Sequence, residues 1–141
     1  MIWLLALFVT GGAPVERPPV SGQVTFLYYN DLDAAARFYG DVLGLEKTFD
    51  LSWVKIFRLS ETSSVGLVNA SRGAHKPSSE KPVMVSLVVR PADVDVWYSY
   101  LKQKGVGVGA PPETGADGSV RAFGFKDPEG YTLEVFAWIQ R

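Results

Sequence analysis

The chain has 141 residues, the size of one domain with a substantial core, and its 47% hydrophobic and 21% charged residues are typical of a globular protein. Its 14 Lys and Arg residues nearly balance its 15 Asp and Glu residues and form no basic run, so nucleic acid is not expected as a partner. The absence of Cys excludes disulfides, thiol nucleophiles and thiolate metal sites.

The first twenty residues differ from the rest of the chain. Residues 2–9 form an unbroken apolar run, shorter than the roughly 20 residues that span a bilayer, so no stable membrane span is expected. Small residues at 11–13 and a Pro-rich segment follow, an order that predicts a secretory signal peptide in residues 1–13 and export to the periplasm or medium. Because no Lys or Arg precedes the run, an extra N-terminal strand in a cytoplasmic protein is the alternative. The expected boundaries are 1–20 for signal and linker and 21–141 for one folded domain.

The first half of the domain has the pattern of one strand, one helix and three further strands. Residues 24–29 are β-branched and aromatic and predict a strand. Asn30 or Asp31 is the expected N-cap of a helix that ends near Leu43, where Gly44 stops it. The remaining elements are expected to be strands over 46–50, 53–59 and 64–69, and a connector over 70–81.

The second half repeats this order. A strand over 83–89 is expected to lead to Asp93, the N-cap of a helix that ends near Lys104. Residues 107–111 are poor strand material and are expected to form a weak or irregular strand, and strands over 119–126 and 131–138 are expected to form a hairpin around residues 127–130. Repetition of one unit predicts two modules that complete one core together. The expected fold is therefore α+β, with two βαβββ modules forming one curved mixed sheet and the helices on its convex face.

Several short sequence motifs within this pattern resemble those of a known protein family. They are Asp31-Leu-Asp, Phe38-Tyr-Gly-Asp-Val-Leu-Gly-Leu45, Asp93-Val-Asp and Asp127-Pro-Glu-Gly-Tyr-Thr-Leu-Glu-Val135. In this order and spacing, the chain from Gln23 onward resembles the vicinal oxygen chelate (VOC) superfamily of glyoxalase I, bleomycin-resistance proteins, fosfomycin-resistance enzymes and extradiol dioxygenases. The resemblance implies the two-module fold and a homodimer, but it names no reaction, because function depends on the site.

The resemblance also implies four positions that hold a divalent metal in enzymes of this superfamily. Here these positions are Val24, Gly66, Met84 and Glu134. Val and Gly offer no side-chain donor, a thioether is a poor ligand for hard cations, and catalytic sites use about three protein ligands. We therefore expect no metal and no other cofactor. The single His of the chain, His75, lies in the connector and is expected to be a solvated loop residue.

Glu134 has two interpretations. It is a candidate catalytic residue, acting as a general base in a largely apolar pocket. Alternatively it is a paired structural group: if residues 127–130 close a tight hairpin, Phe123 lies opposite Glu134, and Arg121 lies diagonally within reach on the same face.

Side-chain alternation predicts a ligand site on the concave face. It places Val24, Phe26 and Tyr28 there from the first strand, and Met84, Ser86 and Val88 from the second module. Trp53 and Phe57 come from another strand of the first module, and alternation alone does not decide which side of that strand faces the ligand. Such an aromatic cup suits a hydrophobic or planar small molecule, unless the rings fill it. The expected ligand-binding residues are Val24, Phe26, Tyr28, Trp53, Phe57, Gly66, Met84, Ser86, Arg121 and Glu134.

Three classes of function fit these observations. The leading hypothesis is a small-molecule binding protein that has the VOC fold and a degenerate metal site. The second is a VOC-type enzyme, a lyase, isomerase or dioxygenase-like protein, that uses Glu134 without metal or with a metal site completed by a partner chain. The third is a non-catalytic interaction protein with a filled cup. The sequence leaves open whether the protein is an enzyme.

Overall fold

A computed structural model describes residues 17–139 of the chain. The predicted signal peptide, or the alternative N-terminal strand, falls on residues that lie outside this range. Residues 17–22 are irregular and the regular structure begins at Gln23. Within the described part of the chain, neither of the α-helices is long and apolar enough to cross a membrane.

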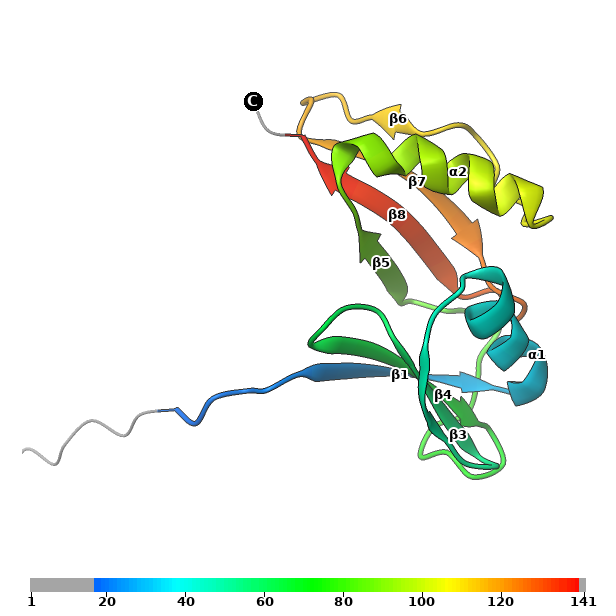
Figure 1. Ribbon diagram of the computed structural model, residues 1–141. Coiled ribbons are helices and arrows are strands. Elements are labelled where there is room, and N and C mark those ends of the chain that lie inside the picture. Colours follow the sequence, from blue (N-terminus) through cyan, green and yellow to red (C-terminus); the bar gives the residue numbers. More distant parts are fainter. Residues whose placement is uncertain (1–16, 140–141) are drawn as a thin grey trace, which may run out of the picture.

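The first module is a four-stranded mixed sheet with a helix on one face (Figure 1). Its elements are β1 (Gln23–Tyr29), α1 (Leu32–Arg37), the π-helical turn η1 (Phe38–Val42), β2 (Lys47–Asp50), β3 (Val54–Arg58) and β4 (Ser63–Asn69). The strand order is β1-β4-β3-β2, and β1 runs parallel to β4. Asp31 caps α1 as expected, because its Oδ1 accepts a hydrogen bond from the backbone N–H of Ala34 at 2.9 Å.

The second module repeats this architecture with the strand order β5-β8-β7-β6. Its elements are β5 (Met84–Val88), the 3₁₀ turn η2 (Pro91–Asp93), α2 (Val94–Gln103), β6 (Glu113–Thr114), β7 (Val120–Lys126) and β8 (Thr132–Trp138). The weak strand expected over 107–111 does not form, and β6 begins at Glu113, two residues after the end of this stretch. Gly109 has φ +54° and Pro111 has no N–H, so this stretch does not form a ladder. Asp93 does not cap α2 with its side chain, which instead pairs with the Arg90 guanidinium at 2.7 Å.

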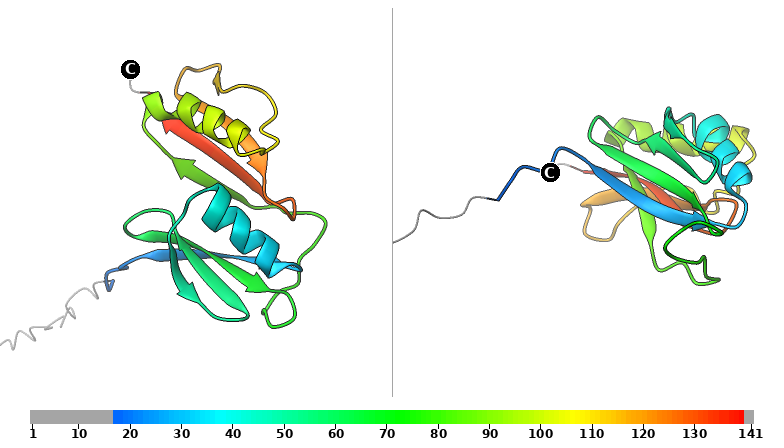
Figure 2. Two further views of the ribbon diagram at one scale, coloured as in Figure 1. Left: turned by 45° about the vertical axis from the view of Figure 1, so that its right-hand side comes forward. Right: turned by 90° about the horizontal axis from the view of Figure 1, so that it is seen from below.

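Both helices lie on the same side of the two sheets (Figure 2). The main core lies between the helices and the sheets and includes the fully buried side chains of Tyr29, Tyr39, Leu67, Leu101 and Leu133. The described strands form two separately hydrogen-bonded sheets, in which β1 and β5 are edge strands. The predicted α+β fold of two βαβββ modules is confirmed, but each module has its own four-stranded sheet instead of a share in the one curved sheet expected.

A buried polar cluster connects the two modules. The turn between β7 and β8 brings Asp127, which is almost fully buried, to β1 and η1 of the first module. The Tyr29 hydroxyl donates to Asp127 Oδ2 at 2.6 Å, and the Tyr39 hydroxyl donates to the same oxygen at 3.3 Å. Burial is the main reason why the pKa values of Tyr29 and Tyr39 lie well above the ordinary range. Both hydroxyls therefore stay protonated and act as donors to Asp127.

The same turn also binds the backbone where β1 meets α1. The carboxylate of Glu129 accepts hydrogen bonds from the backbone N–H groups of Asn30 and Asp31, both at 2.9 Å. The Tyr131 hydroxyl donates to the carbonyl oxygen of Tyr28 at 2.9 Å. These contacts and the Asp127 cluster form an intermodule clasp that fixes β1, and hence its exposed face, relative to the second module.

Candidate functional site

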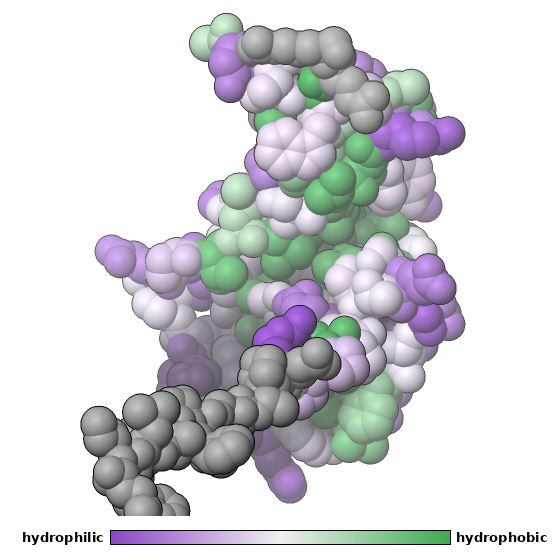
Figure 3. Space-filling view, turned by 90° about the vertical axis from the view of Figure 1, so that its left-hand side faces the viewer, coloured by the Kyte–Doolittle hydropathy of each residue, from purple (hydrophilic) through white to green (hydrophobic). Residues whose placement is uncertain are grey.

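The sheet face opposite the helices in the first module is aromatic and partly exposed. Leu27 and Tyr29 of β1 are buried toward the helices, whereas Val24 and Phe26 are exposed on the other face. The expected alternation along β1 is therefore confirmed. In a space-filling view, hydrophobic residues gather between the upper and lower modules (Figure 3).

In the second module, the corresponding face carries the one carboxylate of the four metal positions. Met84 and Val88 of β5 are exposed there, and Val85 between them is buried. Ser86 lies directly opposite Glu134 of β8, and its hydroxyl donates to Glu134 Oε1 at 2.6 Å. The partner of Glu134 is therefore Ser86.

Arg121 does not lie on this face, and the pairing expected between Arg121 and Glu134 is wrong. Gly124, not Phe123, lies opposite Glu134 in the β7–β8 ladder. The turn contains one residue more than expected, Gly130 in the left-handed region at φ +87°, and a shift of one residue moves every side chain to the other face. The Arg121 guanidinium lies on the helix side and donates to the Asp95 carboxylate of α2 at 2.7 and 3.0 Å.

Phe57 also belongs to the helix side. Its side chain is only 2% exposed and forms part of the core next to the Tyr39 ring, with a centroid distance of 6.1 Å. Alternation along β3 places the neighbouring Ile56 on the opposite face, in the pocket described below. Phe57 is therefore a core residue, and its expected place in the ligand site is wrong.

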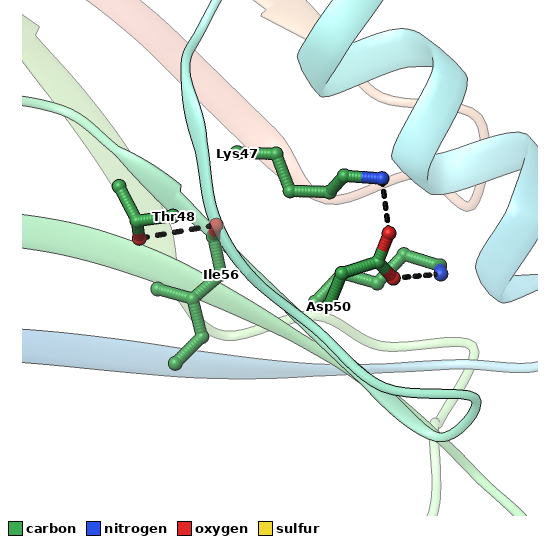
Figure 4. Close-up of polar contacts among 5 residues, drawn as sticks. Lys47, Thr48, Asp50 and Ile56 are labelled. Atoms are coloured by element: carbon green, nitrogen blue, oxygen red, sulfur yellow. Dashed lines mark hydrogen bonds and ion pairs between the residues drawn. The ribbon is translucent and has the colours of Figure 1, made fainter.

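A β-bulge in the β2–β3 hairpin decides which side chains of β2 face the ligand side. Lys47 and Asp50 are three residues apart, which in a regular strand would place them on opposite faces. The ladder shifts between Lys47 and Phe49, so Lys47 and Asp50 share the helix side and form an ion pair, which Lys55 joins at 2.5 Å (Figure 4). Hydrogen bonds from Lys47 and Lys55 hold the pKa of the Asp50 carboxyl below its ordinary value. Phe49 then faces the other way, away from these charges.

The exposed face of the first module contains an apolar pocket of about 520 Å³, which we call the aromatic pocket. Phe26 and Tyr28 of β1 and Trp53 before β3 line it, and the β2–β3 hairpin and the connector after β4 complete it. Its lining residues are Phe26, Tyr28, Phe49, Leu51, Trp53, Val54, Ile56, Val68, Arg72, Gly73 and Ala74. Phe49 and Leu51 were not predicted, although the alternation of Phe49, Leu51 and Trp53 was a usable signal. Arg72 was not predicted either, because no periodic signal marks it.

Two glycines allow the rings of β1 to lie close to the backbone. A Cβ atom at Gly66 would lie 2.4 Å from Cδ1 of Phe26, and one at Gly73 would lie 2.6 Å from Cδ1 of Tyr28. Real side chains do not approach so closely, so each ring occupies space that the missing side chain leaves. His75 contacts the Tyr28 ring edge-on, with a centroid distance of 5.2 Å. The exposed connector thus packs against the pocket wall.

The residues at the four metal positions do not fit a metal ion. Val24 adjoins Gly66 in the first module, Glu134 is bonded to Ser86 in the second, and Met84 and Glu134 supply one thioether and one carboxylate. Among residues 17–139, no group of three or more His, Asp or Glu side chains is placed to hold a metal. None of these four positions lines the aromatic pocket, although Gly66 lies against its Phe26 ring.

Two βαβββ modules with both helices on one side define a paired-module α+β protein. A family model described as the Glyoxalase/Bleomycin resistance protein/Dioxygenase superfamily matches residues 21–135. The chain belongs to this superfamily. A comparison with curated proteins finds no match.

Solved structures with this fold are similar over most of the chain. A glyoxalase/bleomycin resistance protein/dioxygenase from Nocardioides is 26% identical, with a TM-score of 0.71 over 90% of this chain and 87% of that one. A superfamily member from Sphaerobacter thermophilus is also 26% identical, with a TM-score of 0.69 over 84% and 98%. A lactoylglutathione lyase from Agrobacterium tumefaciens, 24% identical with a TM-score of 0.70 over 86% and 96%, shares the fold.

Proposed function

We propose that this protein binds a hydrophobic, planar small molecule in the aromatic pocket and that binding needs no metal. The observation that carries the proposal is the pocket itself: about 520 Å³ of space lined by aromatic and aliphatic side chains. Ligand pockets are typically about 300–1,000 Å³ and mostly apolar. The alternative, that the aromatic side chains fill the concave face and leave no pocket, is disfavoured because the pocket remains open beside these side chains.

The exposure of the rings supports the same proposal. Phe26, Phe49 and Trp53 are 45%, 46% and 37% exposed, although they belong to the same pocket. Exposed apolar side chains that cluster in a concave place mark a binding site more often than isolated ones do. A flat ligand gains by covering these rings, because each aromatic contact adds about 0.5–1.5 kcal/mol beyond the area that it buries.

The test is titration of the purified protein with 2-naphthamide, a flat neutral probe, by calorimetry. Saturable binding to one site is expected, with about tenfold lower affinity in Trp53→Ala, because the pocket loses one wall. Trp138→Ala is the matched control, because Trp138 is an exposed Trp of β8 in the other module. Absence of binding to the wild-type protein, or equal affinity in Trp53→Ala, would refute the proposal.

A VOC-type enzyme that uses Glu134 is the second candidate. It is favoured by the position of Glu134 on the exposed face, where Oε2 has no hydrogen bond within residues 17–139 and is free to accept a proton. Lactoylglutathione lyase activity, after which one structural neighbour is named, is a suitable first assay. If turnover is found, Glu134→Gln should lower it about a hundredfold, as loss of a general base does. Elemental analysis of untagged protein tests whether a partner-completed metal site exists.

We also propose a homodimer and export directed by residues 1–13. The dimer is supported by the edge strands β1 and β5, each of which pairs on one side only among the described strands, and by the exposed apolar residues of both strands. Light scattering at high micromolar concentration should give twice the monomer mass. Export is supported by the apolar run followed by small residues, and N-terminal sequencing of protein from an exporting host should show cleavage after it.

A further inference from the structure

We propose that the ligand of the aromatic pocket is a planar aromatic anion whose acid group binds Arg72. The inference rests on the proposed function and specifies its ligand class. Arg72 is the one charged side chain among the described residues that line the pocket, and all but this Arg, Gly73 and Ala74 are aromatic or branched apolar residues. A ligand that covers the rings therefore places one edge beside a single positive charge.

The guanidinium of Arg72 is available for a ligand. Within residues 17–139, its side chain forms no ion pair and no hydrogen bond, whereas three other guanidiniums are paired with carboxylates: Arg58 with Glu46, Arg90 with Asp93, and Arg121 with Asp95. A free guanidinium at the rim of an apolar pocket binds a carboxylate or sulfonate through two parallel N–H donors. The ligand rings partly exclude water from this contact and so strengthen it.

The backbone holds Arg72 in a fixed place. Its N–H donates to the carbonyl oxygen of Asn69 at 3.0 Å, and the N–H of Gly73 donates to the same oxygen at 2.9 Å. The Asn69 side chain in turn accepts from the N–H of Ser71 at 2.9 Å. Gly73 lies against the Tyr28 ring. Because the loop is already ordered around these bonds, little backbone freedom is lost when a ligand binds Arg72.

The charges around the pocket favour an anion over a cation. No Asp or Glu is among the described lining residues. The nearest acidic group along the hairpin, Asp50, points to the helix side, where Lys47 and Lys55 bind it (Figure 4). A cationic ligand would therefore meet Arg72 without a compensating carboxylate.

The experiment compares three flat probes of one shape that differ in charge: 2-naphthoate, 2-naphthamide and 2-naphthylmethylammonium. Calorimetric titration of the wild-type protein is expected to give the order anion, neutral, cation, with about tenfold between the first two, as for a hydrogen-bonded charge. Arg72→Gln should remove this preference, so that the affinities for 2-naphthoate and 2-naphthamide become equal. Arg72→Lys should keep only part of it, because ammonium lacks the planar pair of donors.

The control variant is Arg37→Gln. Arg37 is exposed on α1, on the other side of the sheet, so its removal changes the net charge equally without touching the pocket. Equal affinity of the wild-type protein for 2-naphthoate and 2-naphthamide, or an equal loss in both variants, would overturn the inference and leave the proposed function intact. If none of the three probes binds, the proposed function itself fails, and the inference with it.

Discussion

The close approach between Gly66 and Phe26 gives a sharp test of the pocket. In Gly66→Ala, the new Cβ would lie 2.4 and 2.5 Å from two ring carbons of Phe26, whereas carbon atoms pack at about 3.5 Å or more. The ring must therefore retreat by about 1 Å, and because it is partly exposed it moves outward, where it borders the pocket. We expect 2-naphthamide affinity to fall about five- to tenfold, measured by calorimetry, while the free energy of unfolding changes by less than about 1 kcal/mol.

A second glycine of the same face provides the matched control. Gly124 lies opposite Glu134 in the other module, and a Cβ there would meet only a backbone oxygen at an ordinary 3.6 Å. Gly124→Ala should therefore leave probe affinity unchanged. Adding Phe26→Ala to Gly66→Ala should abolish the steric effect, so that Gly66→Ala no longer weakens binding in that background. Undiminished affinity in Gly66→Ala alone would show that the ring does not border the ligand.

The intermodule clasp gives two further predictions. Above pH 10 the protein should lose stability, because the unfolded chain ionises its tyrosines while burial keeps Tyr29 and Tyr39 protonated in the folded state. Below pH 10 this effect is absent, and above it each hydroxyl lowers the free energy of unfolding by about 1.4 kcal/mol per pH unit. In urea melts, the free energy of unfolding should therefore fall less steeply with pH in Tyr29→Phe than in the wild-type protein. An equally steep fall in both would contradict this reasoning. Glu129→Gln should lower Tm by about 3–8 °C in calorimetry, because an amide nitrogen replaces one of the carboxylate oxygens that accept from the Asn30 and Asp31 N–H groups. An unchanged Tm would show that the protein does not need these hydrogen bonds for stability.

Alternation and capping patterns were enough to predict the modules and much of β1. The rings of Phe26 and Tyr28 were placed correctly because a strand with one buried face has one possible orientation. The N-cap was predicted to be Asn30 or Asp31 because a cap acts locally, and the structure shows Asp31, three residues from its donor. Such features depend on residues that are close in the chain, so they can be predicted from the sequence.

Features that depend on one extra residue could not be predicted in the same way. Gly130 adds a residue to the β7–β8 turn, and the bulge near Thr48 adds one to β2. Each changes which face the side chains beyond it occupy, which is why Arg121 was assigned to the wrong face and why Lys47 lies on the same face as Asp50. The position of Arg72 depends on a loop fold without periodicity, which alternation arguments do not reach.

The replaced metal position and the aromatic wall are linked through Gly66. A glutamate there would place its Cβ within the ring of Phe26, and the adjacent Val24 offers no donor to share a metal. Gly66→Glu should therefore gain no affinity for Mn²⁺ or Zn²⁺ in calorimetric titrations, and it should destabilise the protein unless Phe26→Ala is present to make room. A stoichiometric metal site in Gly66→Glu alone would contradict this reasoning. As long as Phe26 lies over Gly66, this backbone position supports an aromatic ring and cannot also carry a metal-binding carboxylate.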